Sequence, residues 1–356
     1  MSARQARIGV IGAGWWSTYT HIPGLIENPH AHLAAICDRS EEACERATTA
    51  FPGPAAFVDV ETMLAETELD GVVIAIPHAA HYDVASRCLD AGLNVMLEKP
   101  MVLTARHAAD LVQRAEAQVV ELIIGYPWHF TRTAIRAREV IASGELGDIQ
   151  HVVCTQSSMV VEFYRGNDAA YQPVFEWTVA GPGDVYARPE VSGGGQGHLQ
   201  ITHSSGLMFF VTGLRPQRVC ALMSSFDVPV DLVDVMTVEF EGGALGVVSG
   251  TGNVPVGDAG QLDVRAYCEH GYVLLDAITG ALEIHRRDGS IERDQLAPDD
   301  TYPRFTTAAN LVDVCLGREP NGSPAAFGHR SVELLDAAYR SAANGGRMIE
   351  VNDLYA

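Results

Sequence analysis

The stretch RIGVIGAGWWS at residues 7–17 joins a short β-prone run to a glycine turn, and residues 19–26 can continue it as a helix. In a nucleotide-binding strand–turn–helix unit, the first glycine permits the tight turn and the second lets the backbone approach a pyrophosphate at the positive end of the helix. Gly12 and Gly14 occupy these two places, and Ser17 stands where a third glycine is usual. The stretch predicts a dinucleotide-binding turn, with Trp15 and Trp16 beside the cofactor.

An acidic residue ends the second β-prone run. Asp38 follows the run at residues 32–37, a little over twenty residues beyond the glycine turn. A carboxylate at this place accepts hydrogen bonds from the adenosine ribose and repels a 2′-phosphate, which favours NAD. Arg39 comes next and can either stack on adenine or pair with the phosphate of NADP, so NADP remains possible.

Strand-like and helix-like segments alternate as far as residue 124, which predicts a doubly wound parallel sheet. Ligands of such sheets bind outside the carboxyl ends of the strands. These ends bring Pro77, His78, His81, Glu98 and Lys99 to the rim that carries the glycine turn. The expected segments are helix 40–50, strand 71–76, helix 81–91, strand 94–97, helix 104–117 and strand 119–124.

The composition excludes several classes of protein. A net charge of −21 disfavours nucleic acid, whose phosphates are bound by Lys and Arg. No window approaches the roughly 18 uninterrupted apolar residues of a membrane-spanning helix, and the first residues do not have the pattern of a signal peptide. The 7 cysteines are scattered, without a CxxC pair. We therefore expect a cytoplasmic protein without membrane, nucleic-acid or metal partners.

Lys99 is the only lysine among the 24 Lys and Arg residues of the chain. Arginine supplies surface charge as well as lysine does, but only a compact ammonium on a flexible stem can be desolvated, shift its pKa and point at one oxygen. A chance survivor of an arginine-biased composition is the alternative. The location of Lys99 on the ligand rim favours a functional role.

The glycine turn, Asp38, the IPHAAH stretch at residues 76–81 and above all the Glu-Lys-Pro tripeptide at residues 98–100 resemble one family. The chain is similar to the glucose–fructose oxidoreductase, inositol dehydrogenase and MocA (Gfo/Idh/MocA) family, up to the closing segment 327–351. The resemblance implies an NAD(P)-dependent oxidoreductase for a sugar, polyol or inositol-like alcohol. It also implies a C-terminal α/β domain with an open, mainly antiparallel sheet that commonly serves as an oligomer interface.

Carried over residue by residue, Lys99 matches the family's lysine near the nicotinamide and the substrate hydroxyl. Glu98 matches the neighbour that contacts the cofactor ribose, and His81 matches the histidine of the loop after the strand. The family's second signature is a glycine-rich turn leading into a helix that carries an Asp and, four residues later, a His. It matches residues 192–203, where His203 falls at the family's histidine. The usual Asp four residues earlier is replaced by Leu199.

On a regular helix Gln196, Gln200 and His203 share one face, so amides rather than a carboxylate are expected beside His203. Our hypothesis makes His203 the general base and Lys99 the cation that stabilises a developing alkoxide. The alternatives are a structural core histidine at 203 or a base at His198. Redox-assisted elimination or glycoside cleavage with tightly bound NAD, and a non-catalytic dinucleotide sensor, are the competing functions.

Aromatic and hydrogen-bonding residues that suit a sugar ring are Tyr126, Trp128, Tyr164 and Arg165, although Tyr126 and Trp128 can equally pack the domain junction. We assign residues 1–125 to the Rossmann domain and residues 126–356 to a substrate-binding and oligomerisation domain. Residues 167–192 lack periodicity and predict a long loop, typical of a lid.

The second domain is expected to hold a β-meander, covered on one face by helices 305–316 and 329–343. Its other face is expected to be buried in a homodimer or homotetramer. The expected strands are 218–225, 232–241, 244–249, 262–269, 272–275 and 281–285.

Overall fold

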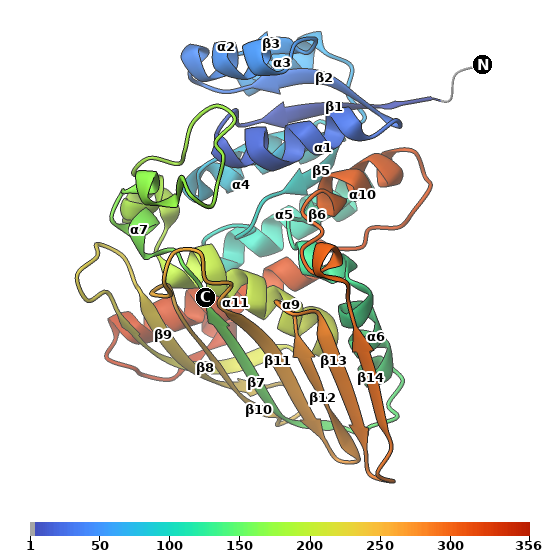
Figure 1. The fold of residues 1–356 in the computed structure, drawn as a ribbon, viewed down its shortest axis with the longest axis vertical. Helices are drawn as coiled ribbons and strands as arrows, with labels where there is room; N and C mark the ends of the chain where they lie inside the picture. The colour runs from blue at the N-terminus through green and yellow to red at the C-terminus, as the bar shows by residue number, and fades with distance from the viewer. Residues whose placement is uncertain (1–3) are drawn as a thin grey trace.

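The computed structural model describes residues 4–356, which form two sheets with helices between and around them (Figure 1). The first sheet has 6 strands, all parallel, in the order β3-β2-β1-β4-β5-β6. This is the expected doubly wound sheet, and its carboxyl ends point toward the second half of the chain. The strands are β1 Ala6–Ile11, β2 Ala31–Cys37, β3 Ala55–Phe57, β4 Gly71–Ile74, β5 Asn94–Leu97 and β6 Leu122–Ile124.

Helices connect these strands largely where they were expected. The Ser40 side chain accepts a hydrogen bond from the Ala43 amide and starts one helix, and Thr104 caps another through the His107 amide. The strand expected at 119–124 is shorter, because Val119 ends the preceding helix in a left-handed conformation with φ 56°. The helices are α1 Ile22–Glu27, α2 Glu41–Ala50, α3 Val60–Glu66, α4 His81–Asp90 and α5 Ala105–Gln118.

The second sheet has 9 strands in the order β14-β13-β12-β11-β7-β10-β9-β8-β15. Every neighbouring pair is antiparallel except β7 and β10, so the sheet is mixed and mainly antiparallel. The strands are β7 Ile149–Ser157, β8 Pro216–Ser224, β9 Val233–Phe240, β10 Leu245–Thr251, β11 Gln261–Cys268, β12 Gly271–Asp276, β13 Ala281–Arg286, β14 Ile291–Gln295 and β15 Ile349–Glu350.

The sequence did not predict β7, although this strand lies in the middle of the second sheet. Val152, Cys154 and Gln156 alternate on its buried face, and the polar Gln156 hides the apolar alternation by which a strand is recognised. The strand β14 was also missed, because its sequence IERDQ is almost entirely polar.

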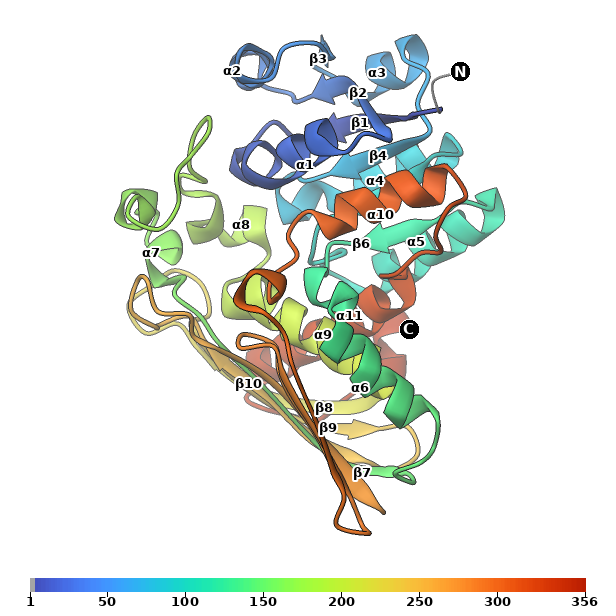
Figure 2. The ribbon, with the colours of Figure 1, turned by 45° about the vertical axis from the view of Figure 1, so that its right-hand side comes forward.

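Helices cover one face of the second sheet and leave the other face bare, as Figure 2 shows nearly edge-on. The covering helices are α6 Arg132–Ala142, α9 Thr202–Thr212 and α11 Ala325–Ala343. Every residue of α9 is buried, which is typical of a helix enclosed by protein on all sides. No helix within residues 4–356 combines the length and apolar character needed to cross a membrane.

One predicted covering helix packs elsewhere. The helix α10 Thr306–Cys315 lies on the first sheet, against β4, β5 and α1, instead of on the second sheet. Its apolar residues Ala308, Leu311 and Val312 join the core that contains Ile8 and Met96. The segment before α10 therefore returns to the rim of the first sheet and passes the cavity described below.

Candidate active site

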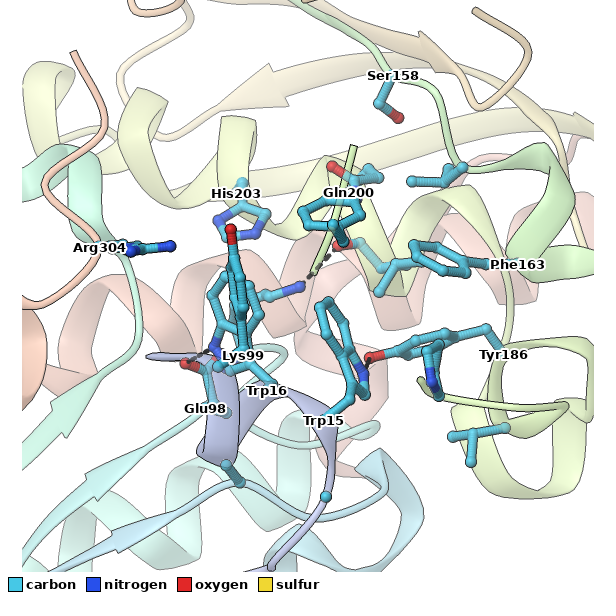
Figure 3. A pocket seen from close by; sticks show the side chains of 18 of the residues that line it. Trp15, Trp16, Glu98, Lys99, Ser158, Phe163, Tyr186, Gln200, His203 and Arg304 are labelled. Atoms are coloured by element: carbon cyan, nitrogen blue, oxygen red, sulfur yellow. Dashed lines mark hydrogen bonds between the residues drawn. The ribbon is translucent and has the colours of Figure 1, made fainter. Parts of the chain in front are cut away.

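One continuous cavity of about 790 Å³ opens along the carboxyl ends of the first sheet and extends to the second sheet (Figure 3). Asp38 lines one region of it, and His203, on the helical segment beside the second sheet, lines another. A long cleft at the carboxyl ends of parallel strands is the usual site of a dinucleotide and its substrate. The residues of the first sheet that line it are Gly12, Gly14, Trp15, Trp16, Tyr19, Asp38, Arg39, Ser40, Ala75, Ile76, Pro77, His78, Glu98 and Lys99.

The glycine turn fits a pyrophosphate. Gly14 has no atom within 4 Å of the place where a Cβ would stand, so open space lies over this part of the backbone. Asp38 is held beside the turn, because its two carboxylate oxygens accept the amides of Ala13 and Ser40, each at 2.9 Å. These residues fit a dinucleotide with its adenosine ribose near Asp38 and its pyrophosphate over Gly14.

Gly12 and Gly14 have different requirements, which a pair of variants separates. Gly12 has φ +100°, and an added Cβ would lie 2.2 Å from the carbonyl oxygen of Ala75. We expect Gly12→Ala to lower the free energy of unfolding by about 3 kcal/mol, the cost of a strained backbone position. Gly14→Ala, whose methyl group meets only open space, should unfold like the wild type but bind NAD more weakly. Urea unfolding and NAD titration measure the two effects; equal stability of the two variants would contradict this assignment.

Glu98 is buried and acts as a fixed anchor beneath the cavity. Its Oε1 accepts the indole N–H of Trp16 at 2.9 Å and lies 2.9 Å from Nε2 of His21, while its Oε2 accepts the amide of Lys99. Burial alone would raise the pKa of Glu98, but the hydrogen bond and charge of His21, with Lys99 and Trp16, lower it below its ordinary value. Both oxygens thus orient the Lys99 backbone and the Trp16 ring.

Lys99 lies in the cavity, next to a cis peptide bond to Pro100. Its Nζ donates a hydrogen bond to the backbone carbonyl of Leu199 at 2.9 Å. In the family's pattern an Asp stands at position 199. In this chain Lys99 donates instead to the neutral backbone carbonyl of Leu199. Burial of the ammonium lowers the pKa of Lys99 from 10.5 to about 8, against the opposing effect of Glu98. The side chain is a cation at neutral pH that can lose its proton at mildly alkaline pH.

The second signature forms a π-helical turn, Gly197–Ile201, that runs directly into α9. A second π-helical turn, Ser17–His21, precedes α1 on the other side of the cavity. Such turns are rare and occur often at functional sites. The wider turn at 197–201 changes which side chains share a face, so Gln200 and His203 line the cavity while Gln196 does not.

The prediction of one shared face was therefore wrong for Gln196. Its side-chain nitrogen instead donates to the backbone carbonyl of Gln156 on β7, and its side-chain oxygen accepts the Tyr164 hydroxyl. Gln156 also donates from its side chain to Oε1 of Gln200 at 2.9 Å. This contact fixes the Gln200 amide so that its N–H groups remain for a ligand.

His203 is buried, and its ring meets the ring of Trp128 edge to face at 5.3 Å. Burial is the largest cause that lowers the pKa of His203 well below 6.5, followed by the charges of Lys99 and His129. The imidazole is therefore neutral near pH 7. Its Nδ1 has no hydrogen-bond partner among the described residues.

His198, the alternative base, lies outside the cavity. Its ring stacks on Tyr339 with centroids 4.4 Å apart, and the residue does not line the cavity. His198 and His203 are five residues apart across the π-helical turn, and their rings therefore lie in different surroundings.

Aromatic residues of the 167–192 loop close one wall of the cavity. Tyr186 accepts the indole N–H of Trp15 at 3.2 Å, and Phe175 lies edge to face with Trp15 at 6.1 Å. The loop carries the short helix α8 Pro189–Ser192, and α7 Val161–Tyr164 precedes it. His78 fixes the end of the loop through the Ser192 carbonyl at 2.8 Å. The sequence suggested a lid here but gave no means of selecting these residues.

Four predicted site residues lie outside the cavity lining. Tyr126 is buried against Gly206 of α9 and contacts the Thr202 hydroxyl. Tyr164 is buried behind the wall, and Arg165 lies at the surface, paired with Glu162 and Asp227.

His81, the fourth, contacts the carbonyl of Ile76, just after β4, and the carbonyl of Pro100 in the Lys99 turn. It is placed to hold the Lys99–Pro100 turn against the end of β4 rather than to touch a ligand. Trp128, by contrast, does line the cavity.

Several lining residues were not among the predicted ones. They come from several separate segments, and the spacing of residues in the sequence does not show that these segments meet at the cavity. They are Tyr19, Gln156, Ser158, Phe163, Phe175, Tyr186, Tyr302 and Arg304.

Comparisons with known proteins agree with this site and fold. Residues 6–126 match the family model described as "Oxidoreductase family, NAD-binding Rossmann fold", and residues 134–274 match the GFO/IDH/MocA C-terminal domain. The chain is 28% identical to the rhizopine catabolism protein MocA of Rhizobium meliloti over 71% of this chain and 73% of that protein.

A second relative is D-xylose 1-dehydrogenase (NADP(+)) 2 of Haloferax volcanii, 26% identical over 95% of this chain and 97% of that protein. Among solved structures, GenD2 from gentamicin A biosynthesis in complex with NAD has a TM-score of 0.78 and 25% identity, covering 98% of this chain and 97% of that one. The family resemblance, the fold class and the nicotinamide cofactor expected from the sequence are thereby confirmed. With both halves of the chain matched by its models, the protein belongs to the Gfo/Idh/MocA family of NAD-binding oxidoreductases.

Proposed function

We propose that the protein interconverts a secondary alcohol and a ketone on a sugar, polyol or inositol-like substrate, with NAD as the preferred cofactor. The observation that carries this proposal is the position of the chain's only lysine: Lys99 lies in the cavity with its Nζ 2.9 Å from the Leu199 carbonyl, and His203 lines the same cavity. The D-xylose dehydrogenase relative, and a 28% identical inositol 2-dehydrogenase of Corynebacterium glutamicum, support the substrate class by their names.

A bound nicotinamide supplies the hydride acceptor for alcohol oxidation and the hydride donor for the reverse direction. The Lys99 ammonium stabilises the negative charge that develops on the substrate oxygen, because a cation in a water-poor cavity acts strongly on a nearby alkoxide. His203 accepts the hydroxyl proton. Its neutral state at pH 7 leaves a ring nitrogen free to do so. Gln200 donates to a neighbouring hydroxyl and orients the ring.

The preference for NAD rests on Asp38. Its carboxylate is fixed by the Ala13 and Ser40 amides at the end of β2, where it accepts ribose hydroxyls and repels a 2′-phosphate. Arg39 lines the cavity beside it and stacks on adenine in this proposal.

The proposal includes a homodimer or homotetramer formed through the bare face of the second sheet. Leu222, Val235, Leu245 and Tyr267 are exposed apolar or aromatic residues on its strands β8, β9, β10 and β11. An apolar sheet face of this kind is stabilised when a second copy covers it.

Absorbance of reduced nicotinamide with a panel of sugars, sugar acids, polyols and inositols tests the function. We expect net NADH from at least one member of the panel, with NADP less effective than NAD. Product formation without net NADH, by an enzyme that keeps its NAD through purification, would favour elimination or glycoside cleavage and contradict the proposal. Binding of NAD without turnover of any panel member would favour a sensor.

A further inference from the structure

Arg304 enters the cavity from the segment that links β14 to α10. Its guanidinium lies over the ring of Tyr19 at 4.8 Å and over the ring of Phe305 at 4.6 Å. Figure 3 shows this side chain extending toward His203, on the side of the cavity away from Tyr186. Two aromatic rings thus orient a cation toward the proposed reaction centre.

This cation has no acidic partner within residues 4–356. No carboxylate of the described chain lies within 4.0 Å of Arg304, and its guanidinium makes no hydrogen bond there. Arg132 and Arg136 of α6, in contrast, pair with Asp294 and Glu292 of β14. A partly buried guanidinium with all five donors unused is stabilised by an anion that arrives with the ligand.

A neutral donor stands beside it. Tyr302 lines the same cavity, with its ring 4.9 Å from the ring of Trp128, and its hydroxyl has no hydrogen-bond partner among the described residues. Burial raises the pKa of Tyr302, as does the charge of Glu98, so the hydroxyl keeps its proton and can donate.

Three carboxylates line the cavity, and each already accepts hydrogen bonds from the chain. Glu98 is buried, and its oxygens are already occupied by Trp16, His21 and the Lys99 amide. Asp38 accepts the Ala13 and Ser40 amides, and Asp258, in the loop before β11, accepts the Gly260 amide. Lys99 adds a second cation on the same cavity wall as Leu199. An acidic group placed at Arg304 therefore meets a guanidinium without an acidic partner among the described residues, with the Lys99 ammonium in the same cavity.

We propose that Arg304 and Tyr302 bind a carboxylate of the substrate, so that the protein acts on acidic sugars or cyclic polyol acids in preference to their neutral counterparts. A planar carboxylate matches the paired N–H groups of a guanidinium, and the Tyr302 hydroxyl can donate to one of its oxygens. The inference rests on the proposed function and names its substrate class. It also fixes the orientation of the substrate, with the acid group at Arg304 and the reacting hydroxyl toward Lys99 and His203.

The test compares matched pairs of compounds: D-glucuronate with D-glucose, D-galacturonate with D-galactose, and quinate with myo-inositol. For the wild type we expect kcat/KM to be at least about tenfold higher for an acid than for its neutral partner. Arg304→Gln should lower kcat/KM for the acid about 10- to 100-fold, the effect of losing hydrogen bonds to a charged group. The loss should appear mainly in KM, while the neutral partner changes little.

Two further variants distinguish a loss of carboxylate recognition from a general loss of activity. Arg132→Gln removes the same charge from a surface residue paired with Asp294, and it should leave the preference for acids unchanged. Tyr302→Phe should reduce the preference for acids less than Arg304→Gln does, since it removes one neutral donor. Equal or better turnover of the neutral partners, or an equal loss for both members of each pair in Arg304→Gln, would overturn the inference.

A binding measurement tests the proposed carboxylate site independently of the proposed reaction. Quenching of tryptophan fluorescence by D-glucuronate, D-galacturonate and quinate is measured in the presence of NAD, where Trp15, Trp16 and Trp128 line the cavity. Binding of an acid that is lost in Arg304→Gln supports the carboxylate site even where no NADH forms. If none of the three acids quenches the fluorescence and none is turned over, the inference is wrong, whatever the wild type does with neutral sugars.

Discussion

Lys99→Met is expected to lower kcat by about 10²- to 10³-fold, the loss that follows removal of one group that stabilises a developing oxyanion. Methionine retains the length and the apolar stem of lysine and removes the ammonium that donates to the Leu199 carbonyl. Because the glycine turn and Asp38 are untouched, the affinity for NAD should change little. Steady-state kinetics and fluorescence titration with NAD measure the two quantities.

The matched control is Arg106→Met, which removes a cation whose side chain donates to the Leu354 carbonyl and does not line the cavity. This variant should keep the kcat of the wild type. Near-normal turnover in Lys99→Met would remove the central role proposed for the lysine. A large loss of NAD affinity in that variant would instead assign Lys99 to cofactor binding.

His203→Asn is expected to lower kcat by about 10²- to 10⁴-fold, the usual contribution of a positioned general base. Asparagine is close to the shape of the imidazole ring but cannot accept a proton at neutral pH. His198→Asn provides the control on the same helical segment, since His198 is equally buried but stacks on Tyr339 outside the cavity. Rates of NADH formation for the two variants, with melting temperatures to confirm folding, decide between them.

A loss of activity in His198→Asn as large as that in His203→Asn would contradict the assignment. It would show that the segment, and not the ring of His203, is sensitive to substitution. The control is necessary because the chain lacks the family's Asp. Leu199 stands in its place and has no carboxylate that could orient His203, and its backbone carbonyl accepts the hydrogen bond of Lys99.

The first sheet was predictable because its signals are local. Buried strands bounded by turn residues and helices with capping residues such as Ser40 and Thr104 appear in the sequence in the order in which they pack. The second sheet was less predictable. Its middle strand β7 carries Gln156 on the buried face, and α10 is an apolar helix whose sequence does not say which sheet it covers.

The same distinction holds for the site. Residues at strand ends, such as Asp38, Glu98 and Lys99, could be placed because the carboxyl ends of parallel strands meet at one edge. Tyr302 and Arg304 could not, since their position depends on where α10 packs. Gln196 was misplaced because the sequence gives no sign that residues 197–201 form a π-helical turn instead of a regular helix.

The pH dependence of kcat/KM for alcohol oxidation tests the division of roles between Lys99 and His203 most directly. His203, with its pKa well below 6.5, is already neutral at pH 7, whereas Lys99 loses its positive charge as the pH rises through its pKa of about 8. With Lys99 as the cation and His203 as the base, kcat/KM should be level near neutrality and fall above about pH 8, and this fall should be absent in Lys99→Met. A wild-type rate that instead rises through pH 8 would mean that neutral Lys99 takes the proton, and it would contradict the account.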